Sequence, residues 1–255
     1  MPERRFRVTA ADDLTVASYN IHKGVGPDRK RNPARIAAVI AEIGADILAL
    51  QEVDMRFGNR EGLLDLAALR RDLGLIAVPV DSVRDAHGFH GNLLMVRNAL
   101  VQQVHHLILP GLEPRGALIS DLQIAGHPLR VVSTHLGLLA GSRRQQARAI
   151  LDKLSTLDAW PILLMGDLNE WRHGARSPLE ALNAHFTKPA KLRSFPARFP
   201  LFALDRMMTN AQAELIGLDV HDTPLARRAS DHLPIKAQLR LIGLQPTAGP
   251  LVDGT

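Results

Sequence analysis

The sequence predicts an α/β fold with a β-sheet packed inside other layers. Two apolar runs, DILAL at 46–50 and PILLM at 161–165, are continuous rather than alternating, which is typical of strands buried on both faces. Segments with helix caps and apolar stripes lie between such runs. The chain has 255 residues, of which 46% are hydrophobic, so it has enough apolar material for one large core.

Short apolar runs mark the predicted strands, which lie at residues 14–20, 46–53, 91–98, 116–124, 129–136, 161–169 and 233–242. No internal repeat, low-complexity block or linker divides the chain. We therefore predict a single catalytic domain over residues 1–243, followed by a mobile tail over 244–255 that lacks periodicity.

The first helix is predicted over residues 33–43. Asn32 before Pro33 combines an N-cap residue with a proline in the first helical position. One face of this segment is apolar and holds Ile36, Val39, Ile40 and Ile43. A second helix is predicted over residues 61–73.

Two serines have the spacing of a capping box. Ser142 is followed by Gln145, and Ser177 is followed by Pro178 and Glu180. In a capping box the hydroxyl and the later side chain satisfy free N–H groups at the start of a helix. We therefore predict helix N-termini at both serines.

The segment 186–204 is a long loop with three prolines and poor periodicity. A loop of this length inside a compact domain more often serves a site than merely connects two elements. Its aromatic residues Phe195, Phe199 and Phe202 have two interpretations. They could face a bilayer, or they could fill the underside of the loop, and we favour the second because large apolar side chains are usually buried.

The composition excludes some kinds of site. The chain has no cysteine, so any metal must be held by oxygen or imidazole ligands. Its 31 Lys and Arg against 26 Asp and Glu give a net charge of +5, which favours an anionic ligand but is too small for a nucleic-acid footprint by itself. The N-terminal segment has no apolar signal region, and no stretch reaches the length of a membrane span. We therefore expect a cytoplasmic location.

Polar side chains recur at the ends of the predicted strands. They are Asn20, Glu52, His135, Asp167, Asn169, Asp205, Asp231 and His232. If these ends converge, they assemble carboxylate, amide and imidazole groups with no thiol, a set that suits a hard divalent cation such as Mg²⁺ or Mn²⁺.

Each of these residues also has a simpler interpretation. Asp167 or Asn20 alone could be a turn former, and His135 could be a hydrogen-bonded core histidine. The segment 230–232 could be only the cap of the last strand. The recurrence of polar residues at several strand ends is what favours a site.

Seven motifs, taken in order, resemble the motif series of the endonuclease/exonuclease/phosphatase superfamily, which includes pancreatic-type deoxyribonucleases. They are ASYNIHKG, ILALQEVD, HGNLLMVRN, VVSTHLGL, LMGDLNEW, FALDRMM and ASDHLPI, and they span residues 14 to 240. The segments NIHKG, HGFHGN and RSFPARFPLFALDR resemble those of a branch of small, stand-alone bacterial members. The resemblance implies a four-layered α/β-sandwich, with two mixed β-sheets packed face to face and helices outside, and Mg²⁺-dependent hydrolysis of a phosphate ester.

The resemblance also implies roles for single residues. Glu52 is the expected principal metal ligand, with Asn20 supporting the metal or the phosphate and Asp231 close to the metal. Asp167 is expected to position or deprotonate the attacking water, and Asn169 to bind a non-bridging phosphate oxygen.

Further residues are expected on the phosphate side. His232, oriented by Asp205, is expected to contact the phosphate, and His135 to donate to it or to protonate the leaving group. Lys23, Asn92 and Arg206 are the expected substrate-binding residues. Glu170 has no role implied by the resemblance and is expected to be a surface acid.

The substrate stays open between several classes. A phosphodiester is favoured, either in nucleic acid or in a phospholipid head group, although an aromatic content of 4% offers few stacking platforms for single strands. A phosphomonoester of a small metabolite and a non-catalytic phosphate-binding module are the alternatives. A Zn²⁺ hydrolase that uses His87, His90 and His135 is disfavoured because the carboxylate-rich set fits a harder ion. No obligate protein partner is evident.

Overall fold

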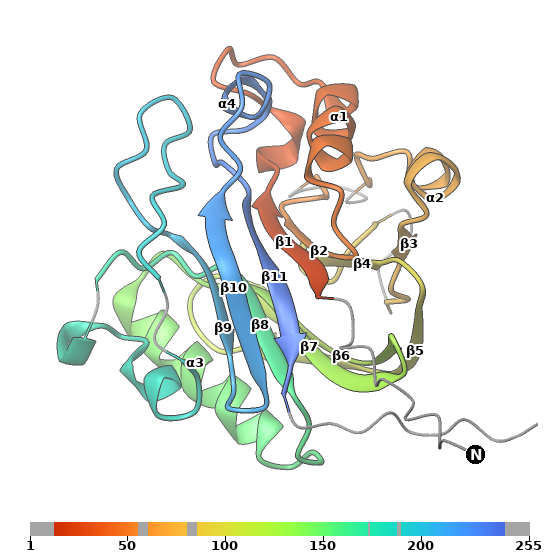
Figure 1. Cartoon of the computed structure of the whole chain (residues 1–255). Coiled ribbons are helices and arrows are strands. Elements are labelled where there is room, and N and C mark those ends of the chain that lie inside the picture. The colour runs from red at the N-terminus through yellow and green to blue at the C-terminus, as the bar shows by residue number, and fades with distance from the viewer. Residues whose placement is uncertain (1–12, 56–60, 81–85, 173, 188–189, 243–255) are drawn as a thin grey trace, which may run out of the picture.

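Two β-sheets form the centre of the described part of the molecule (Figure 1). The structure, a computed structural model, describes residues 13–55, 61–80, 86–172, 174–187 and 190–242. The predicted tail at 244–255 lies outside these residues, and the prediction of one domain over 1–243 stays a prediction. Among the helices described, none has the length and apolar character needed to cross a membrane.

The first sheet is mixed and has the strand order β10-β11-β1-β2-β4-β3. Its strands are β1 (Leu14–Asn20), β2 (Ile47–Gln51), β3 (Ile76–Ala77), β4 (Leu93–Val96), β10 (Ala213–Val220) and β11 (Ile235–Leu241). β1 runs parallel to β2 and antiparallel to β11. Because β1 and β2 are parallel neighbours, Asn20 and the residue after β2, Glu52, emerge at the same edge.

The second sheet is also mixed and has the strand order β5-β6-β7-β8-β9. Its strands are β5 (Ala99–Leu109), β6 (Arg115–Ile124), β7 (His127–His135), β8 (Ile162–Asp167) and β9 (Asp205–Thr209). β7 and β8 are parallel, with His135 opposite Asp167, and Asp167 is also opposite Asp205 of β9. Three candidate site residues therefore lie side by side at one edge.

The two sheets pack face to face through one apolar cluster. Val16 and Ala49 of the first sheet lie in this cluster with Val131, Leu163 and Met165 of the second. Alternate residues of the same strands face outward into other clusters, as Leu164 does on β8. The continuous apolar runs are therefore buried on both faces, as the sequence predicts.

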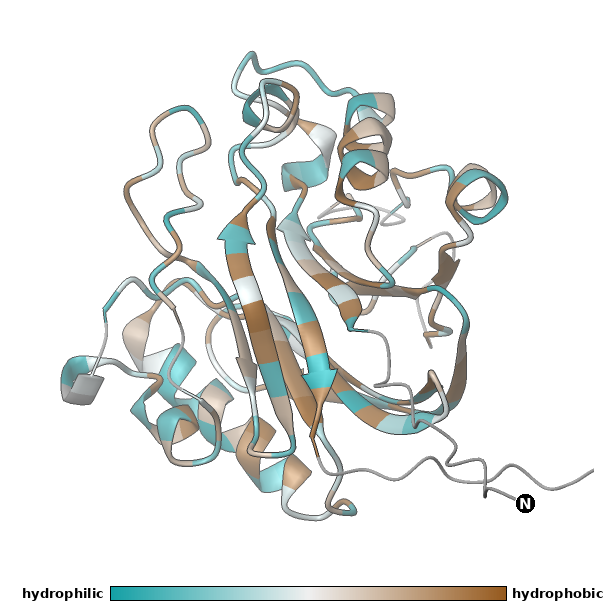
Figure 2. Ribbon diagram, in the orientation of Figure 1, coloured by the Kyte–Doolittle hydropathy of each residue, from teal (hydrophilic) through white to brown (hydrophobic). Residues whose placement is uncertain are grey.

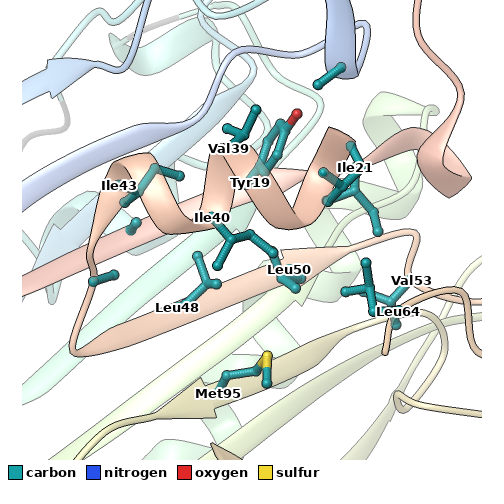
Figure 3. Close-up of a cluster of buried hydrophobic side chains, with 14 of the residues drawn as sticks. Tyr19, Ile21, Val39, Ile40, Ile43, Leu48, Leu50, Val53, Leu64 and Met95 are labelled. Atoms are coloured by element: carbon teal, nitrogen blue, oxygen red, sulfur yellow. The ribbon is translucent and has the colours of Figure 1, made fainter. Parts of the chain in front are cut away.

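Helices cover the two outer faces. α1 (Pro33–Ile43) packs its predicted stripe against the first sheet, and Figure 3 shows Ile40 and Ile43 directed toward Leu48 and Leu50 of β2. α3 (Ala140–Leu154) packs against the second sheet, and Figure 1 shows the two helices on opposite sides of the sandwich. The predicted four-layered α/β-sandwich is confirmed.

The helix predicted over residues 33–43 is confirmed. The helix predicted over residues 61–73 begins later than predicted. The Asn32 side chain accepts a hydrogen bond from Arg35 N at 3.0 Å, as an N-cap should. The segment 61–73 contains only a shorter helix, α2 (Leu66–Leu73), capped by Asp65, whose carboxylate accepts from Ala68 N at 2.9 Å. The aspartate is the stronger local N-cap, so the helix begins after it.

Both capping-box predictions are wrong. α3 begins at Ala140, two residues before Ser142, which is buried under the 110–113 loop. Ser177 precedes a 3₁₀ turn, η3 (Glu180–Ala184), and its hydroxyl accepts from Leu179 N at 3.2 Å instead of capping an α-helix. Tertiary packing overrides the local pattern at Ser142, and the turn after Ser177 is too short for an α-helix.

The sequence patterns also missed four strands, of which β3 has only two residues. β5 is a sheet-edge strand with several exposed or half-buried residues, and β10 is half exposed, so neither is a continuous apolar run. β9 is short and follows the proline-rich loop directly. The remaining short elements are η1 (His22–Gly24), η2 (Gly174–Arg176) and α4 (Ala226–Ala229).

Gly166 provides a test of the contact between β7 and β8. Its φ is +151°, and a Cβ at this position would lie 1.8 Å from the Thr134 carbonyl oxygen. We expect Gly166→Ala to lower the free energy of unfolding by at least about 2 kcal/mol, because it combines a backbone clash with an unfavourable conformation. Urea unfolding monitored by circular dichroism measures this.

Gly141→Ala is the matched control for that variant. A Cβ on Gly141, in the first turn of α3, would meet nothing within 4 Å. We expect this variant to be neutral or more stable by up to about 1 kcal/mol, since alanine favours the helix. Equal stability of the two variants would contradict the proposed role of Gly166.

Candidate active site

A cavity of about 710 Å³ opens where strands of both sheets end. Its lining includes seven of the eight predicted strand-end residues: Asn20, Glu52, His135, Asp167, Asn169, Asp231 and His232. The eighth, Asp205, lies behind His232 and is 1% exposed. The expected convergence of the strand ends is therefore confirmed.

Asn20 joins the two sheets at this cavity. Its Nδ2 donates to Asp167 Oδ2 at 3.0 Å and lies 3.4 Å from Glu52 Oε1, while its Oδ1 accepts from His22 N at 3.0 Å. The Ser230 hydroxyl donates to the Asn20 carbonyl at 2.7 Å. With both ends of the amide engaged, Asn20 has one orientation and links the carboxylates of the two sheets.

Glu52 follows β2 in a left-handed conformation, with a φ of 57°. Its Oε2 accepts a hydrogen bond from Lys23 Nζ. A non-glycine residue in this region of φ/ψ space costs free energy, and such residues cluster at functional sites. The turn directs the carboxylate into the cavity, which Lys23 also lines.

Asp167 is surrounded by hydrogen-bond donors. Its Oδ1 accepts from Asn169 N at 2.9 Å, and its Oδ2 lies 3.4 Å from His135 Nε2 and 3.7 Å from His232 Nε2. Asn169, with a φ of 52°, holds this turn, and its Nδ2 donates to the Leu136 carbonyl at 2.9 Å. The turn after β8 is thereby tied to the turn after β7.

His232 and Asp205 form a buried ion pair. His232 Nδ1 donates to Asp205 Oδ2 at 2.8 Å, and the Ser194 hydroxyl donates to the same oxygen. Burial opposes the charged imidazole, but the carboxylates of Asp205 and Asp167 outweigh it and raise the pKa of His232 to about 10. His232 is therefore a cation at neutral pH.

His135, in contrast, is uncharged at neutral pH. Burial disfavours its charged form and lowers its pKa to about 4, although Asp167 acts in the other direction. A neutral imidazole keeps one N–H that can donate to a phosphate oxygen. The low pKa does not favour the role of general acid at neutral pH.

The charge of Glu52 follows from its neighbours. Burial disfavours its carboxylate, but His135 and Lys23 together lower the pKa of Glu52 to about 2. Because His135 is uncharged at neutral pH, its share of this effect is lost there, and Lys23 is the cation that remains beside Glu52. Glu52 is ionised in either case.

Two groups of potential metal ligands face one another here. Among the described residues, Asp167, Asp205 and His232 offer ligand atoms within 4.8 Å of one another, although Asp205 and His232 already bond to each other. Glu52 and Asp231 present carboxylates to the same cavity, and Asn20 turns its Nδ2 toward Glu52 while its Oδ1 accepts from His22 N. Oxygen donors of this kind fit a hard divalent cation. The set His87, His90 and His135 does not appear as a cluster in the part of the chain that is described.

Asp231 and His22 complete the rim. Asp231 Oδ1 lies 3.5 Å from His22 Nδ1, which donates to the Val25 carbonyl at 3.0 Å. No role was predicted for His22, although it lies next to the ASYN strand end. Arg115, at the start of β6, also lines the cavity and was missed, because no motif marks it.

Two of the predicted substrate-binding residues do not line the cavity. Arg206 is buried, and its Nη2 donates to the carbonyls of Glu170 and Arg172, the latter at 3.0 Å. Asn92 is fully buried and donates to the Gly116 carbonyl at 3.1 Å and the Phe89 carbonyl at 3.2 Å. The structure therefore gives both residues backbone partners, whereas Lys23 lies in the cavity as expected.

Glu170 is not a surface acid, and that expectation is wrong. Its side chain is fully buried and accepts from Arg143 Nη2 at 2.8 Å and from Arg172 N at 2.7 Å. Arg143 also donates to the Gly137 carbonyl at 3.0 Å. This buried pair holds the turns after β7 and β8 together. The sequence feature that could have indicated this burial is Arg143, which falls on the buried face of α3 with Ala147.

The proline-rich loop serves the site, as predicted. Phe195 lines the cavity, with its ring 4.8 Å from the ring of His232, and Ser194 holds Asp205. The expectation that the phenylalanines fill the underside of the loop is wrong for two of them. Phe199 is 75% exposed and Phe202 is 40% exposed, because the loop turns them outward.

Comparison with known proteins identifies the family. The sequence profile of the Endonuclease/Exonuclease/phosphatase family matches residues 17–232. The chain belongs to this family. It is 30% identical to the uncharacterized protein YbhP of Escherichia coli over 89% of this chain and 96% of YbhP.

Several solved structures share the fold. An endonuclease/exonuclease/phosphatase from Beutenbergia cavernae has a TM-score of 0.68 at 24% identity, covering 90% of this chain and 72% of its own. A mannosyl-6-phosphatase from Bacteroides thetaiotaomicron has a TM-score of 0.68 at 18% identity, covering 89% and 99%. These likenesses establish the architecture of this family member.

Asp205→Asn tests the cause of the His232 charge. Without the carboxylate, we expect the pKa of His232 to fall from about 10 toward its ordinary value of 6.5. Because the folded-state pKa is raised, the pair stabilises the fold fully below about pH 6.5, and this contribution is lost as the pH rises through about 10. NMR titration of the imidazole Cε1–H in metal-free protein measures the shift.

His135 is the internal control in the same spectra. Burial, which the Asp205 substitution does not change, lowers its pKa, so its signal should still titrate near pH 4. A His232 signal that titrates at the same pH in both proteins would show that Asp205 does not hold the charge.

Glu170→Gln tests the buried pair. The substitution leaves the buried Arg143 guanidinium without its carboxylate partner, so we expect a loss of about 3 to 5 kcal/mol in the free energy of unfolding. Asp222→Asn removes the exposed partner of Arg227 and should cost less than about 1 kcal/mol. Urea unfolding measures the loss in each variant. Equal losses would contradict the role of the buried Glu170–Arg143 pair in stability.

Proposed function

We propose that the protein is a Mg²⁺-dependent phosphodiesterase. The observation that carries this proposal is the division of the cavity around Asp167. On one side lie the carboxylate of Glu52 and the amide of Asn20, and on the other the imidazolium of His232. Hydrolysis of an anionic ester requires both charge neutralisation at phosphate oxygens and a base for the water.

The metal half would consist of Glu52, Asn20 and Asp231. The Glu52 and Asp231 carboxylates would hold Mg²⁺, or Mn²⁺ in its place, and Asn20, whose Nδ2 faces Glu52, would support the metal by orienting that carboxylate. When bound there, such an ion withdraws charge from the non-bridging oxygens of a phosphate. Glu52 is suited to this role because it is ionised at neutral pH and fixed by Lys23 and Asn20.

Asp167 would act on the water. As an acceptor at the end of a rigid strand it can orient a water molecule and receive its proton, and a fixed position is what in-line attack requires. Its Oδ1 accepts from Asn169 N and its Oδ2 accepts from Asn20 Nδ2, so both carboxylate oxygens have fixed positions. Asn169, which lines the cavity beside it, would contact a non-bridging oxygen.

The phosphate half would consist of His232, His135 and Arg115. His232 can donate from Nε2 while Nδ1 stays bonded to Asp205, so the ion pair fixes the donor as well as its charge. His135 would add a neutral N–H, and Arg115 a second positive charge on the same cavity. The cations here complement the anionic ester, in agreement with the net charge of +5.

Glu52→Gln and Asp167→Asn test the assignment of these roles. We expect each to lower kcat/KM for a phosphodiester by several orders of magnitude while the protein stays folded, because each acts on charge that develops in the transition state. Glu180→Gln and Asp72→Asn, at exposed positions, are matched controls and should keep full activity. A loss below about tenfold, or about 1.4 kcal/mol, in both site variants would contradict the assignment.

The substrate class is tested by a hydrolysis panel. Bis-p-nitrophenyl phosphate, p-nitrophenyl phosphate, DNA, RNA and phospholipid vesicles are each incubated with Mg²⁺, Mn²⁺ or EDTA. Metal-dependent cleavage of the diester in preference to the monoester is the expected result. Preference for the monoester would favour a phosphomonoesterase, the activity named for the Bacteroides protein of the same fold. Phosphate binding without any hydrolysis would identify a binding module. A cytoplasmic location stays a prediction from the sequence.

A further inference from the structure

Large apolar side chains are exposed on the proline-rich loop beside the cavity. Phe199 is 75% exposed and Leu201 is 61% exposed, and Phe202 lies 5.6 Å, ring to ring, from the half-exposed Trp171. We call these four residues the aromatic patch. In Figure 1 the loop, coloured light blue, projects from the sandwich before β9, and Figure 2 shows brown, hydrophobic segments along it.

Three exposed leucines form a second patch on neighbouring turns. Leu112 is 84% exposed and Leu138 is 65% exposed, with Leu139 next to it. We call these residues the leucine patch. The turns are tied together because Leu138 N donates to Glu113 Oε1 at 2.7 Å. The leucines are therefore displayed by fixed backbone.

Both patches border the candidate active site. Leu138 itself lines the cavity. On the other side, Phe202 N donates to the Phe195 carbonyl at 2.8 Å, and the Phe195 ring forms part of the cavity wall. A surface that covered both patches would therefore place its own groups at the cavity. A large group of exposed apolar side chains on a folded protein usually marks an interaction site.

The charges around the patches are positive. Arg198, next to Phe199, is exposed, and the Arg172 guanidinium lies over the Trp171 ring at 5.4 Å. Arg172 shares the Glu170 carboxylate with Arg143, so this group of charges is positive in sum. The nearby carboxylates are already paired: Glu113 with Arg115 at 2.7 Å, and Asp222 with Arg227. Apolar tips with adjacent arginines complement a surface that is apolar inside and anionic outside.

We propose that the aromatic and leucine patches dock the protein on the surface of an anionic phospholipid layer, so that head-group phosphoesters reach the active site. The inference rests on the proposed function for its substrate class. Leucines decide between a lipid layer and single-stranded nucleic acid, since aliphatic side chains gain by entering an acyl layer but offer bases no stacking surface. Four of the seven patch residues are leucines.

Vesicle binding tests the docking directly. Purified protein is sedimented with vesicles of phosphatidylcholine alone and of phosphatidylcholine mixed with phosphatidylglycerol. We expect binding to the mixed vesicles, weakened by salt, and at least about a tenfold loss of partitioning in Phe199→Ser/Leu201→Ser, because two exposed apolar side chains no longer enter the layer.

The matched control is Leu100→Ser/Ile242→Ser. These side chains are 65% and 46% exposed, but they lie at the opposite ends of their strands from the cavity residues. We expect this variant to bind vesicles like the unchanged protein. Equal loss in both double variants, or no binding of the unchanged protein to mixed vesicles, would overturn the proposal.

Phe199→Leu separates lipid docking from base stacking. A leucine keeps an apolar side chain for the acyl layer but removes the aromatic face. Vesicle partitioning within about twofold of the unchanged protein supports the lipid layer. About a tenfold loss of oligothymidylate binding, in a protein that does not partition onto the mixed vesicles, would instead assign the aromatic patch to nucleic acid and overturn the proposal.

Hydrolysis of soluble bis-p-nitrophenyl phosphate distinguishes failure of this inference from failure of the proposed function. Phe199 and Leu201 do not line the cavity, so their serine variant should hydrolyse the soluble diester at the unchanged rate. Soluble hydrolysis without vesicle binding would overturn only the docking. Vesicle binding by a protein that hydrolyses neither soluble diester nor lipid would support the docking and overturn the proposed function.

Discussion

The hydrogen bond from Asn20 Nδ2 to Asp167 Oδ2 is the contact on which the candidate site depends. It crosses from the last residue of β1 in one sheet to the last residue of β8 in the other. Each sheet contributes residues to the cavity, and neither sheet has the complete donor set. The apolar cluster between the sheets fixes their separation, so the packing of a buried core sets the distance between Glu52 at the end of β2 and Asp167 at the end of β8. The packing of the fold therefore determines the geometry of the candidate site.

Two histidines in one cavity differ in protonation state at neutral pH, because their partners differ. His232 has a carboxylate partner at 2.8 Å and stays protonated, while burial keeps His135 neutral although it lies 3.4 Å from Asp167. The difference follows from the partners on the far side of each ring, since Asp205 belongs to His232 alone. A single cavity can therefore present a fixed cation and a neutral donor to the same phosphate group.

Sequence patterns identified what is periodic or recurrent and missed what depends on distant partners. The apolar runs located the central strands, and the polar residues at their ends located the cavity, because strand direction brings these ends together. The partly exposed strands β5 and β10 carry weak patterns. The burial of Glu170 could not be read locally, since its partner Arg143 lies 27 residues away on a helix. Arg206 and Asn92 were named from nearby motifs, but their side chains turn to backbone carbonyls. The outward turn of Phe199 depends on the course of a loop that has no periodicity.

The position of β11 in the first sheet has a consequence for synthesis of the chain. β1 pairs with β11 through Leu14 and Leu239, so one edge of β1 stays open until almost the whole described chain has left the ribosome. Asp231 and His232 precede this last strand and arrive with it. A nascent chain that has already formed the second sheet therefore has Asp167 but lacks the imidazolium beside it. The candidate site is therefore completed in the final folding step, together with closure of the first sheet.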